Sequence, residues 1–120
     1  MKQKIIICGV GRVGLSITEH LSNEGFDITV IDSNYDAIQK VTELYDVRGV
    51  LGLASHPNVL EDAGIKDADM IIAVTQSDEI NISACHVAKS IFATPTMIIR
   101  IRSKAYLHPK YIDFLLEDLK

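Results

Sequence analysis

The chain has 120 residues, of which 48% are hydrophobic and 23% are charged, and its formal net charge is −4. These values predict one globular domain with a single core and leave little room for a second, substrate-binding domain. The negative charge argues against a nucleic-acid-binding protein, which would need a basic face. No apolar run approaches the roughly 18 residues of a membrane-spanning helix, and no signal-peptide pattern is present, so we expect a cytoplasmic protein.

The first third of the chain predicts two strands, each followed by a helix. Residues 5–8 are apolar and rich in β-branched side chains, which favours a buried parallel strand. Residues 11–22 place apolar side chains at helical spacing. Residues 27–32 predict the second strand, and either Ser33 or Asn34 can cap the helix that follows it.

Three further strands and their helices follow in the same alternation. Residues 48–51 predict a third strand, and a proline at the second position of residues 56–63 favours a short helix there. Residues 70–74 predict the fourth strand, which a polar turn joins to the longest predicted helix, at residues 78–91. Residues 96–102 predict the fifth strand.

Strands that alternate with helices in this way predict an α/β fold. We expect a Rossmann-like, doubly wound parallel sheet in three α/β/α layers, forming a single domain over residues 1–105. Residues 106–120 predict a C-terminal helix with a leucine-rich face. That helix is expected either to contact a second subunit or to begin a further C-terminal part that the chain lacks.

A glycine-rich loop follows the first predicted strand and opens the first predicted helix. Gly9, Gly11 and Gly14 have the spacing G-x-G-x-x-G. Gly9 permits a tight turn, Gly11 lets phosphate oxygens approach the backbone, and Gly14 lets the helix lie close to the sheet. The free N–H groups and the positive end of the helix dipole then favour a pyrophosphate.

An acidic residue, Asp32, ends the second predicted strand, where a carboxylate can accept the hydroxyl hydrogens of an adenosine ribose. A carboxylate there also repels a 2′-phosphate, and the neighbouring Ser33 and Asn34 supply no arginine to bind one. We therefore predict that the site takes NAD or ATP/ADP in preference to NADP.

The ends of the other strands supply further candidates, because ligands of such sheets bind outside the carboxyl ends of the strands. The small residues of the loop 52–55 can let an adenine lie against the backbone, and Thr75 and Gln76 lie near the switch point. Arg100 can reach the ligand from the fifth strand, and Arg12 can bind a phosphate. The alternatives are an ordinary helix-capping loop at residues 52–55, a surface ion pair for Arg100 and a solvated side chain for Arg12.

One further residue of the turn, Asp78, is a candidate N-cap of the longest predicted helix. The two cysteines, Cys8 and Cys85, are far apart and are interpreted as buried, reduced thiols. The four histidines form no cluster with cysteines or carboxylates at metal-ligand spacing. We therefore predict neither a metal site nor a catalytic residue.

Four segments carry a resemblance to a known family: IIICGVGRVG, DITVID, GLASHPNVLEDAGIKDADMIIAVTQSDEINISAC and IIRIRS. Over about residues 3–105 the sequence resembles the N-terminal nucleotide-binding domain of potassium-transport regulators of the Trk type, the KTN/RCK family. The most specific stretch runs from SHPN to DEIN. Plain Rossmann dehydrogenases do not combine such a helix entry with the turn A-V-T-x-x-D-E-x-N.

The resemblance implies a non-enzymatic regulatory subunit at the inner face of the cell membrane. Such domains dimerise, assemble into rings on a membrane potassium transporter or channel, and gate it when NAD(H) or ATP/ADP binds. In several ATP-binding members, an arginine at the place of Arg12 reaches the terminal phosphate in the neighbouring subunit. ATP and ADP therefore remain alternatives to NAD(H).

By the same resemblance, the first glycines and the residues between them hold the pyrophosphate, Asp32 holds the ribose, and Thr75, Gln76 and Arg100 line the nucleotide. With the residue-level predictions, the site consists of Gly9, Val10, Gly11, Arg12, Val13, Gly14, Asp32, Ser33, Gly52, Leu53, Ala54, Thr75, Gln76 and Arg100. Two other functions stay open: the cofactor-binding half of an NAD-dependent oxidoreductase, and an interaction module whose glycine loop binds nothing.

Overall fold

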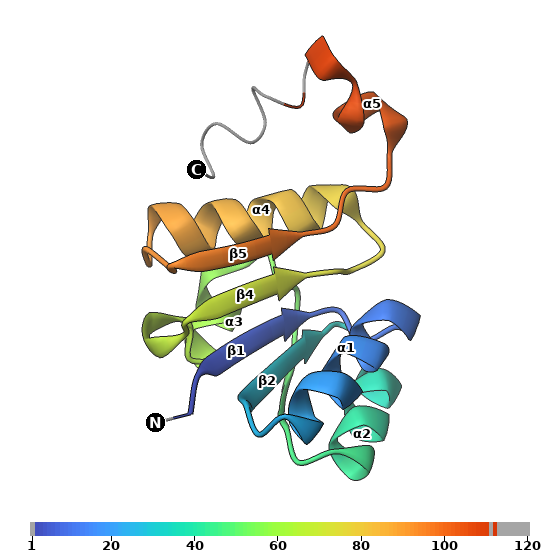
Figure 1. The fold of residues 1–120 in the computed structure, drawn as a ribbon, viewed down its shortest axis with the longest axis vertical. Helices are drawn as coiled ribbons and strands as arrows, with labels where there is room; N and C mark the ends of the chain where they lie inside the picture. The colour runs from blue at the N-terminus through green and yellow to red at the C-terminus, as the bar shows by residue number, and fades with distance from the viewer. Residues whose placement is uncertain (1, 111, 113–120) are drawn as a thin grey trace.

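The computed structural model describes residues 2–110 and 112. Within them, five parallel strands form one sheet in the order β3-β2-β1-β4-β5 (Figure 1). The strands are β1 (Lys4–Cys8), β2 (Asp27–Asp32), β3 (Arg48–Leu51), β4 (Met70–Ala73) and β5 (Thr96–Ile99). The chain starts in the middle of the sheet, builds outward to β3, and then returns to add β4 and β5 on the other side.

Helices connect the strands and cover both faces of the sheet. They are α1 (Arg12–Asn23), α2 (Tyr35–Leu44), α3 (Pro57–Asp62), the short 3₁₀ helix η1 (Ile65–Asp67), α4 (Asp78–Ser90) and α5 (Lys104–Leu107). Figure 1 shows α1 and α2 on one side of the sheet and α3 and α4 on the other. In the described residues, no helix is long and apolar enough to cross a membrane.

The core consists of two apolar clusters, one on each face of the sheet, because alternate side chains of a strand point to opposite faces. Ile5 and Ile7 of β1 pack with the helices α1 and α2. Ile6 and Cys8 pack with α3 and α4, where Cys85 also lies. The predicted α/β fold, with its doubly wound parallel sheet in three layers, is confirmed.

Both cysteines are free and fully buried, as the sequence indicated. Burial raises the pKa of the Cys85 thiol to about 12. It also raises the pKa of Cys8, with a smaller contribution from Cys85 nearby. The two thiols are therefore protonated packing groups of the core.

The predicted bounds of β2 and β3 are confirmed, whereas those of β4 and β5 are too long. β5 ends at Ile99 rather than at residue 102 because β4, its partner strand in the described part of the chain, ends opposite it at Ala73. The last bond of this ladder runs from the N–H of Arg100 to the carbonyl oxygen of Ala73, at 3.0 Å. Of the predicted C-terminal helix at residues 106–120, only residues 106–110 and 112 are described, and α5 covers the first two of them.

The helix starts settle two capping alternatives. Asn34, rather than Ser33, caps α2 by accepting from the N–H of Ala37. The cap of α4 is Ser77, whose hydroxyl accepts from the N–H of Ile80, rather than the candidate Asp78. The carboxylate of Asp78 instead accepts hydrogen bonds from a segment distant in sequence.

Candidate functional site

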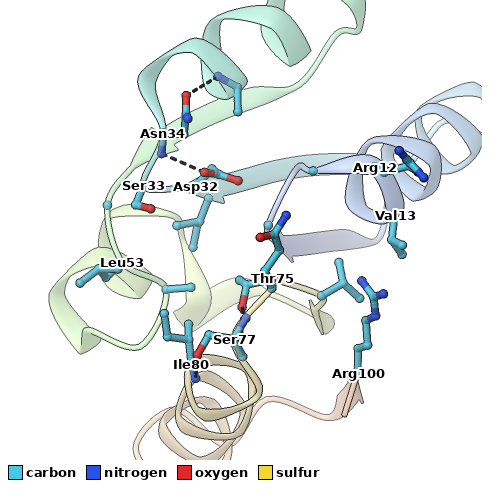
Figure 2. A pocket seen from close by; sticks show the side chains of 18 of the residues that line it. Arg12, Val13, Asp32, Ser33, Asn34, Leu53, Thr75, Ser77, Ile80 and Arg100 are labelled. Atoms are coloured by element: carbon cyan, nitrogen blue, oxygen red, sulfur yellow. Dashed lines mark hydrogen bonds between the residues drawn. The ribbon is translucent and has the colours of Figure 1, made fainter. Parts of the chain in front are cut away.

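A cavity of about 740 Å³ opens at the carboxyl ends of the strands (Figure 2). Its volume lies within the range typical of small-molecule sites. All the predicted site residues line it except Val10 and Gly14. The other lining residues are Ile31, Asn34, Ala37, Val74, Ser77, Ile80 and Arg102. Loops that follow all five strands thus meet at one place, although nucleotide binding there stays a prediction.

Two of the three glycines of the loop are required by the backbone. Gly9 has a φ of 96°, and a Cβ there would lie 2.8 Å from the backbone of Thr75. A Cβ on Gly14 would lie 1.7 Å from the carbonyl oxygen of Gly9. Gly14 therefore allows α1 to pack against the end of β1, which explains why it does not line the cavity.

Gly11 has a different role. A Cβ added there would meet no protein atom within 4 Å, and the residue lines the cavity. The space beside its backbone is consequently open to a ligand. This is the arrangement expected where phosphate oxygens approach a glycine backbone.

The N-terminus of α1 is suited to an anion. Its N-cap, Gly11, provides no side-chain cap, and the first turn contains no acidic residue. The first N–H groups of a helix have no acceptor within the helix, so at α1 they are available to an external one. The dipole of this 12-residue helix adds a partial positive charge at the same point.

Three arginines add full positive charges. Arg12, Arg100 and Arg102 all line the cavity, and among the described residues Asp32 is the only acidic one that does so. None of the three forms an ion pair with a described residue. Figure 2 shows the side chain of Arg100 extending from the end of β5 toward the part of α1 that carries Val13 and Arg12. This charge distribution favours a ligand with more than one phosphate group.

The carboxylate of Asp32 joins the end of β2 to the glycine loop. Its Oδ2 accepts from the N–H of Val10 at 2.9 Å, and its Oδ1 accepts from the N–H of Asn34 at 2.8 Å (Figure 2 draws the second bond). Val10 therefore contributes through its backbone, while its side chain is buried in the core. A carboxylate has about four acceptor positions, so Asp32 retains capacity for ribose hydroxyl groups.

Sequence reasoning missed Asn81, which links two predicted site residues. Its Oδ1 accepts from the N–H of Thr75 at 2.9 Å and from the Thr75 hydroxyl at 2.7 Å. Its Nδ2 donates to the carbonyl oxygens of Thr75 at 3.2 Å and of Arg100 at 3.0 Å. The side chain is fully buried, and these bonds use both its donors and its acceptor.

The second missed role is that of Asp78, one helical turn before Asn81. The residue is 7% exposed. Its Oδ1 accepts from the N–H of Arg102 at 2.9 Å, and its Oδ2 accepts from the N–H of Ser103 at 2.8 Å. Both residues lie on the face of α4 that is buried at Ala84, Cys85 and Ala88. A polar side chain on that face is the sequence signal that could have identified them.

Asp78 should make stability depend on pH at the acid end. The hydrogen bonds from the N–H groups of Arg102 and Ser103 hold the pKa of Asp78 below its ordinary value of 3.8, outweighing the effect of burial, and the charges of Arg102 and Arg100 act in the same direction. Below that value, the unfolded chain takes up a proton that the folded chain does not, so stability falls with pH.

We therefore expect the free energy of unfolding to fall more steeply below about pH 4 in the wild type than in Asp78→Asn. Urea unfolding of both proteins between about pH 6 and about pH 3 measures this difference. The stability advantage of the wild type should narrow as the pH falls. An advantage that stays constant across this range would contradict the assignment.

Comparison with known sequences gives consistent matches. A sequence model of a family described as the TrkA-N domain matches residues 5–113. The Trk system potassium uptake protein TrkA of Azorhizobium caulinodans is 48% identical over 115 residues, which are 96% of this chain and 25% of that protein. The protein of the same name from Vibrio alginolyticus is 50% identical over 107 residues, which are 89% of this chain and 23% of that protein. The chain thus spans about a quarter of the length of these curated relatives.

Solved structures share the fold at lower sequence identity. The TrkA-N domain of the inner membrane protein ybaL from Escherichia coli superposes with a TM-score of 0.83 at 19% identity, over 98% of this chain and 83% of that chain. The GsuK channel bound to NAD gives a TM-score of 0.74 at 21% identity, over 98% of this chain and 20% of that chain. GsuK bound to ADP gives a TM-score of 0.73 at 21% identity, over 98% of this chain and 30% of that chain.

Proposed function

The chain belongs to the TrkA-N domain family, and on that premise we propose that it is a nucleotide-binding regulatory domain of a potassium uptake system. The observation that carries the proposal is the cavity at the strand ends, where Gly11 leaves the backbone open and α1 has an uncapped N-terminus. The near-50% identity to two potassium uptake proteins supports the physiological role.

The proposed ligand is an adenine nucleotide with at least two phosphates, either NAD(H) or ATP/ADP. The N–H groups at the start of α1 and the side chains of Arg12 and Arg100 would hold the phosphates, and Asp32 would hold the ribose. Solved structures with this fold include one bound to NAD and one bound to ADP. These two structures support the proposal that the ligand of this chain belongs to one of the two classes.

We propose binding without chemistry on the ligand. The titratable side chains that line the cavity among the described residues are Asp32 and three arginines. A hydride-transferring enzyme needs an acid–base group facing the substrate, a role for which arginine, which stays protonated, is unsuited. Sustained consumption of NADH in the presence of a small carbonyl compound would instead favour the oxidoreductase alternative.

The proposed mechanism is differential binding. Two nucleotides that differ in their affinity for two arrangements of a homodimer would shift the equilibrium between those arrangements. In a ring of such dimers beneath a membrane potassium transporter, that shift would open or close the ion path. Arg12 supports an inter-subunit contact because it is exposed and has no ion-pair partner among the described residues.

Thermal unfolding with a panel of NAD, NADH, NADPH, ATP, ADP and AMP tests the ligand class. A ligand that binds only the folded state raises the unfolding temperature by mass action, so the shifts rank the affinities. We expect stabilisation by NAD(H) or by ATP and ADP, with a smaller shift for NADPH. The absence of a shift with every nucleotide at millimolar concentration would overturn the proposal.

Asp32 should determine the discrimination against a 2′-phosphate. We expect the wild type to bind NADH at least about tenfold more tightly than NADPH, because the carboxylate repels the additional phosphate. Asp32→Asn should narrow this ratio, since the amide retains an acceptor for the backbone but carries no charge. Fluorescence titration with both dinucleotides measures the ratio.

The matched control is Asp36→Asn. Asp36 is exposed in the first turn of α2 and does not line the cavity, so its replacement removes the same charge nearby without touching the site. Its affinity ratio should equal that of the wild type. Equal ratios in Asp32→Asn and the wild type would exclude Asp32 from ribose recognition.

A further inference from the structure

The chain that leaves β5 is held by side chains of α4 rather than by the sheet. β5 ends at Ile99. Beyond the bond from Arg100 to Ala73, the polar anchors are Asn81, which binds the carbonyl oxygen of Arg100, and Asp78, which binds the N–H groups of Arg102 and Ser103. Two side chains from the first turn of α4 thus define the path of residues 100–103.

The same segment carries charge to the cavity. Arg100 and Arg102 both line it, and neither forms an ion pair with a described residue. Their backbone atoms are the ones that the α4 side chains hold. The backbone position of Arg102 therefore depends on a buried carboxylate that does not itself line the cavity, while the backbone of Arg100 is held by Asn81 and Ala73.

We infer that Asp78 is a positioning residue for the phosphate-binding wall of the site: its carboxylate fixes the backbone at Arg102 and Ser103 so that Arg102, beside Arg100, faces the phosphates of the ligand. The inference rests on the proposed nucleotide-binding function. Asp78 acts through the arginines and makes no contact with the ligand.

The same carboxylate connects the site to the next element. Ser103, one of its two partners, is also the N-cap of α5, and its hydroxyl accepts from the N–H of Ala105 at 3.2 Å. A phosphate that draws the arginines into the cavity would therefore pull on the start of α5 through the backbone that Asp78 holds. Through Asp78, ligand binding in the cavity would therefore change the position of the residues that follow β5.

The affinities of the wild type, Asp78→Asn and Glu79→Gln for ADP and for adenosine test the inference. They distinguish a role of Asp78 in positioning the arginines from a role in stability alone. ADP carries the phosphates that the arginines face, and adenosine lacks them. Glu79 is the exposed neighbour of Asp78 in the first turn of α4, so Glu79→Gln removes the same charge without breaking the two backbone bonds. Affinities are measured by NMR titration at a temperature at which circular dichroism shows each variant folded.

We expect Asp78→Asn to weaken ADP binding about tenfold and to change adenosine binding by less than about twofold. Glu79→Gln should bind both as the wild type does. Equal weakening of ADP and adenosine, or unchanged ADP binding in folded Asp78→Asn, would overturn the inference while leaving the proposed function intact. Failure of the wild type to bind ADP or any other nucleotide of the panel would overturn both.

A measurement on the wild type alone tests the inference even if Asp78→Asn does not fold. Addition of ADP should shift the amide resonances of Arg102 and Ser103 and slow their hydrogen exchange, whereas adenosine should leave them unchanged. If ADP shifts the amide of Gly11 but not those of Arg102 and Ser103, the phosphate wall does not include this segment and the inference is wrong.

Discussion

Gly14→Ala is expected to destabilise the fold severely, whereas Gly11→Ala is expected to keep the fold and lose nucleotide binding. A Cβ on Gly14 would lie 1.7 Å from the carbonyl oxygen of Gly9. Because that contact is with backbone, only a movement of α1 away from the sheet can relieve it. We expect the free energy of unfolding to fall by at least about 3 kcal/mol.

At Gly11 the same substitution adds a methyl group that meets no protein atom within 4 Å. The residue has a φ of −71°, which alanine also adopts. We expect a change in stability below about 1 kcal/mol, because neither strain nor a clash arises. The methyl group projects where phosphate oxygens must approach, so ADP binding should weaken at least about tenfold.

Urea unfolding and calorimetric titration with ADP measure the two effects, and each variant is the control for the other. Both add one methyl group to the same glycine-rich segment, one at the N-cap of α1 and the other in its first turn. Wild-type affinity in Gly11→Ala would show that the ligand does not approach this part of the backbone. Wild-type stability in Gly14→Ala would show that α1 does not pack against β1 as described.

Asn81→Ala is expected to cause the other large loss of stability. It removes every hydrogen bond that joins the ends of β4 and β5 through this fully buried side chain. The N–H of Thr75 and the carbonyl oxygens of Thr75 and Arg100 would lose a partner where water has little access. We expect the free energy of unfolding to fall by about 3 kcal/mol.

Ser83→Ala is a suitable control because Ser83 is exposed on the same helix. Asn81→Asp adds a second comparison: it keeps the acceptor for Thr75 but turns an oxygen toward the carbonyl of Arg100. Urea unfolding should place both Asn81 variants well below Ser83→Ala in stability. A loss of less than about 1 kcal/mol in Asn81→Ala would mean that the network contributes little.

The elements that the sequence predicted most accurately are those decided by local pattern. β2 and β3 each carry β-branched residues and are followed by polar or glycine residues, and their observed bounds equal the predicted ones. β5 was predicted too long because the alternation through Arg100 and Arg102 is typical of a strand. A strand also needs a hydrogen-bonded partner at each residue. The sequence of β5 does not show that β4 ends opposite Ile99.

The candidate site likewise contains residues that a local pattern predicts and residues whose role depends on contacts distant in sequence. The glycine spacing and Asp32 follow a pattern in which each residue has a physical reason, and the structure brings them to one cavity. The roles of Asp78 and Asn81 depend instead on bonds to backbone groups 19, 24 and 25 residues further along the chain. A polar residue near a helix start is usually a cap, and here Ser77 already has that role.

The most direct test of the central claim is a calorimetric titration of the wild-type chain with ADP and with NADH, repeated on Gly11→Ala. We predict saturable binding of at least one of the two nucleotides, with about one molecule bound per chain, and its loss in Gly11→Ala while circular dichroism shows an unchanged fold. A folded wild-type chain that binds neither nucleotide at millimolar concentration would contradict the assignment of this cavity as a nucleotide site.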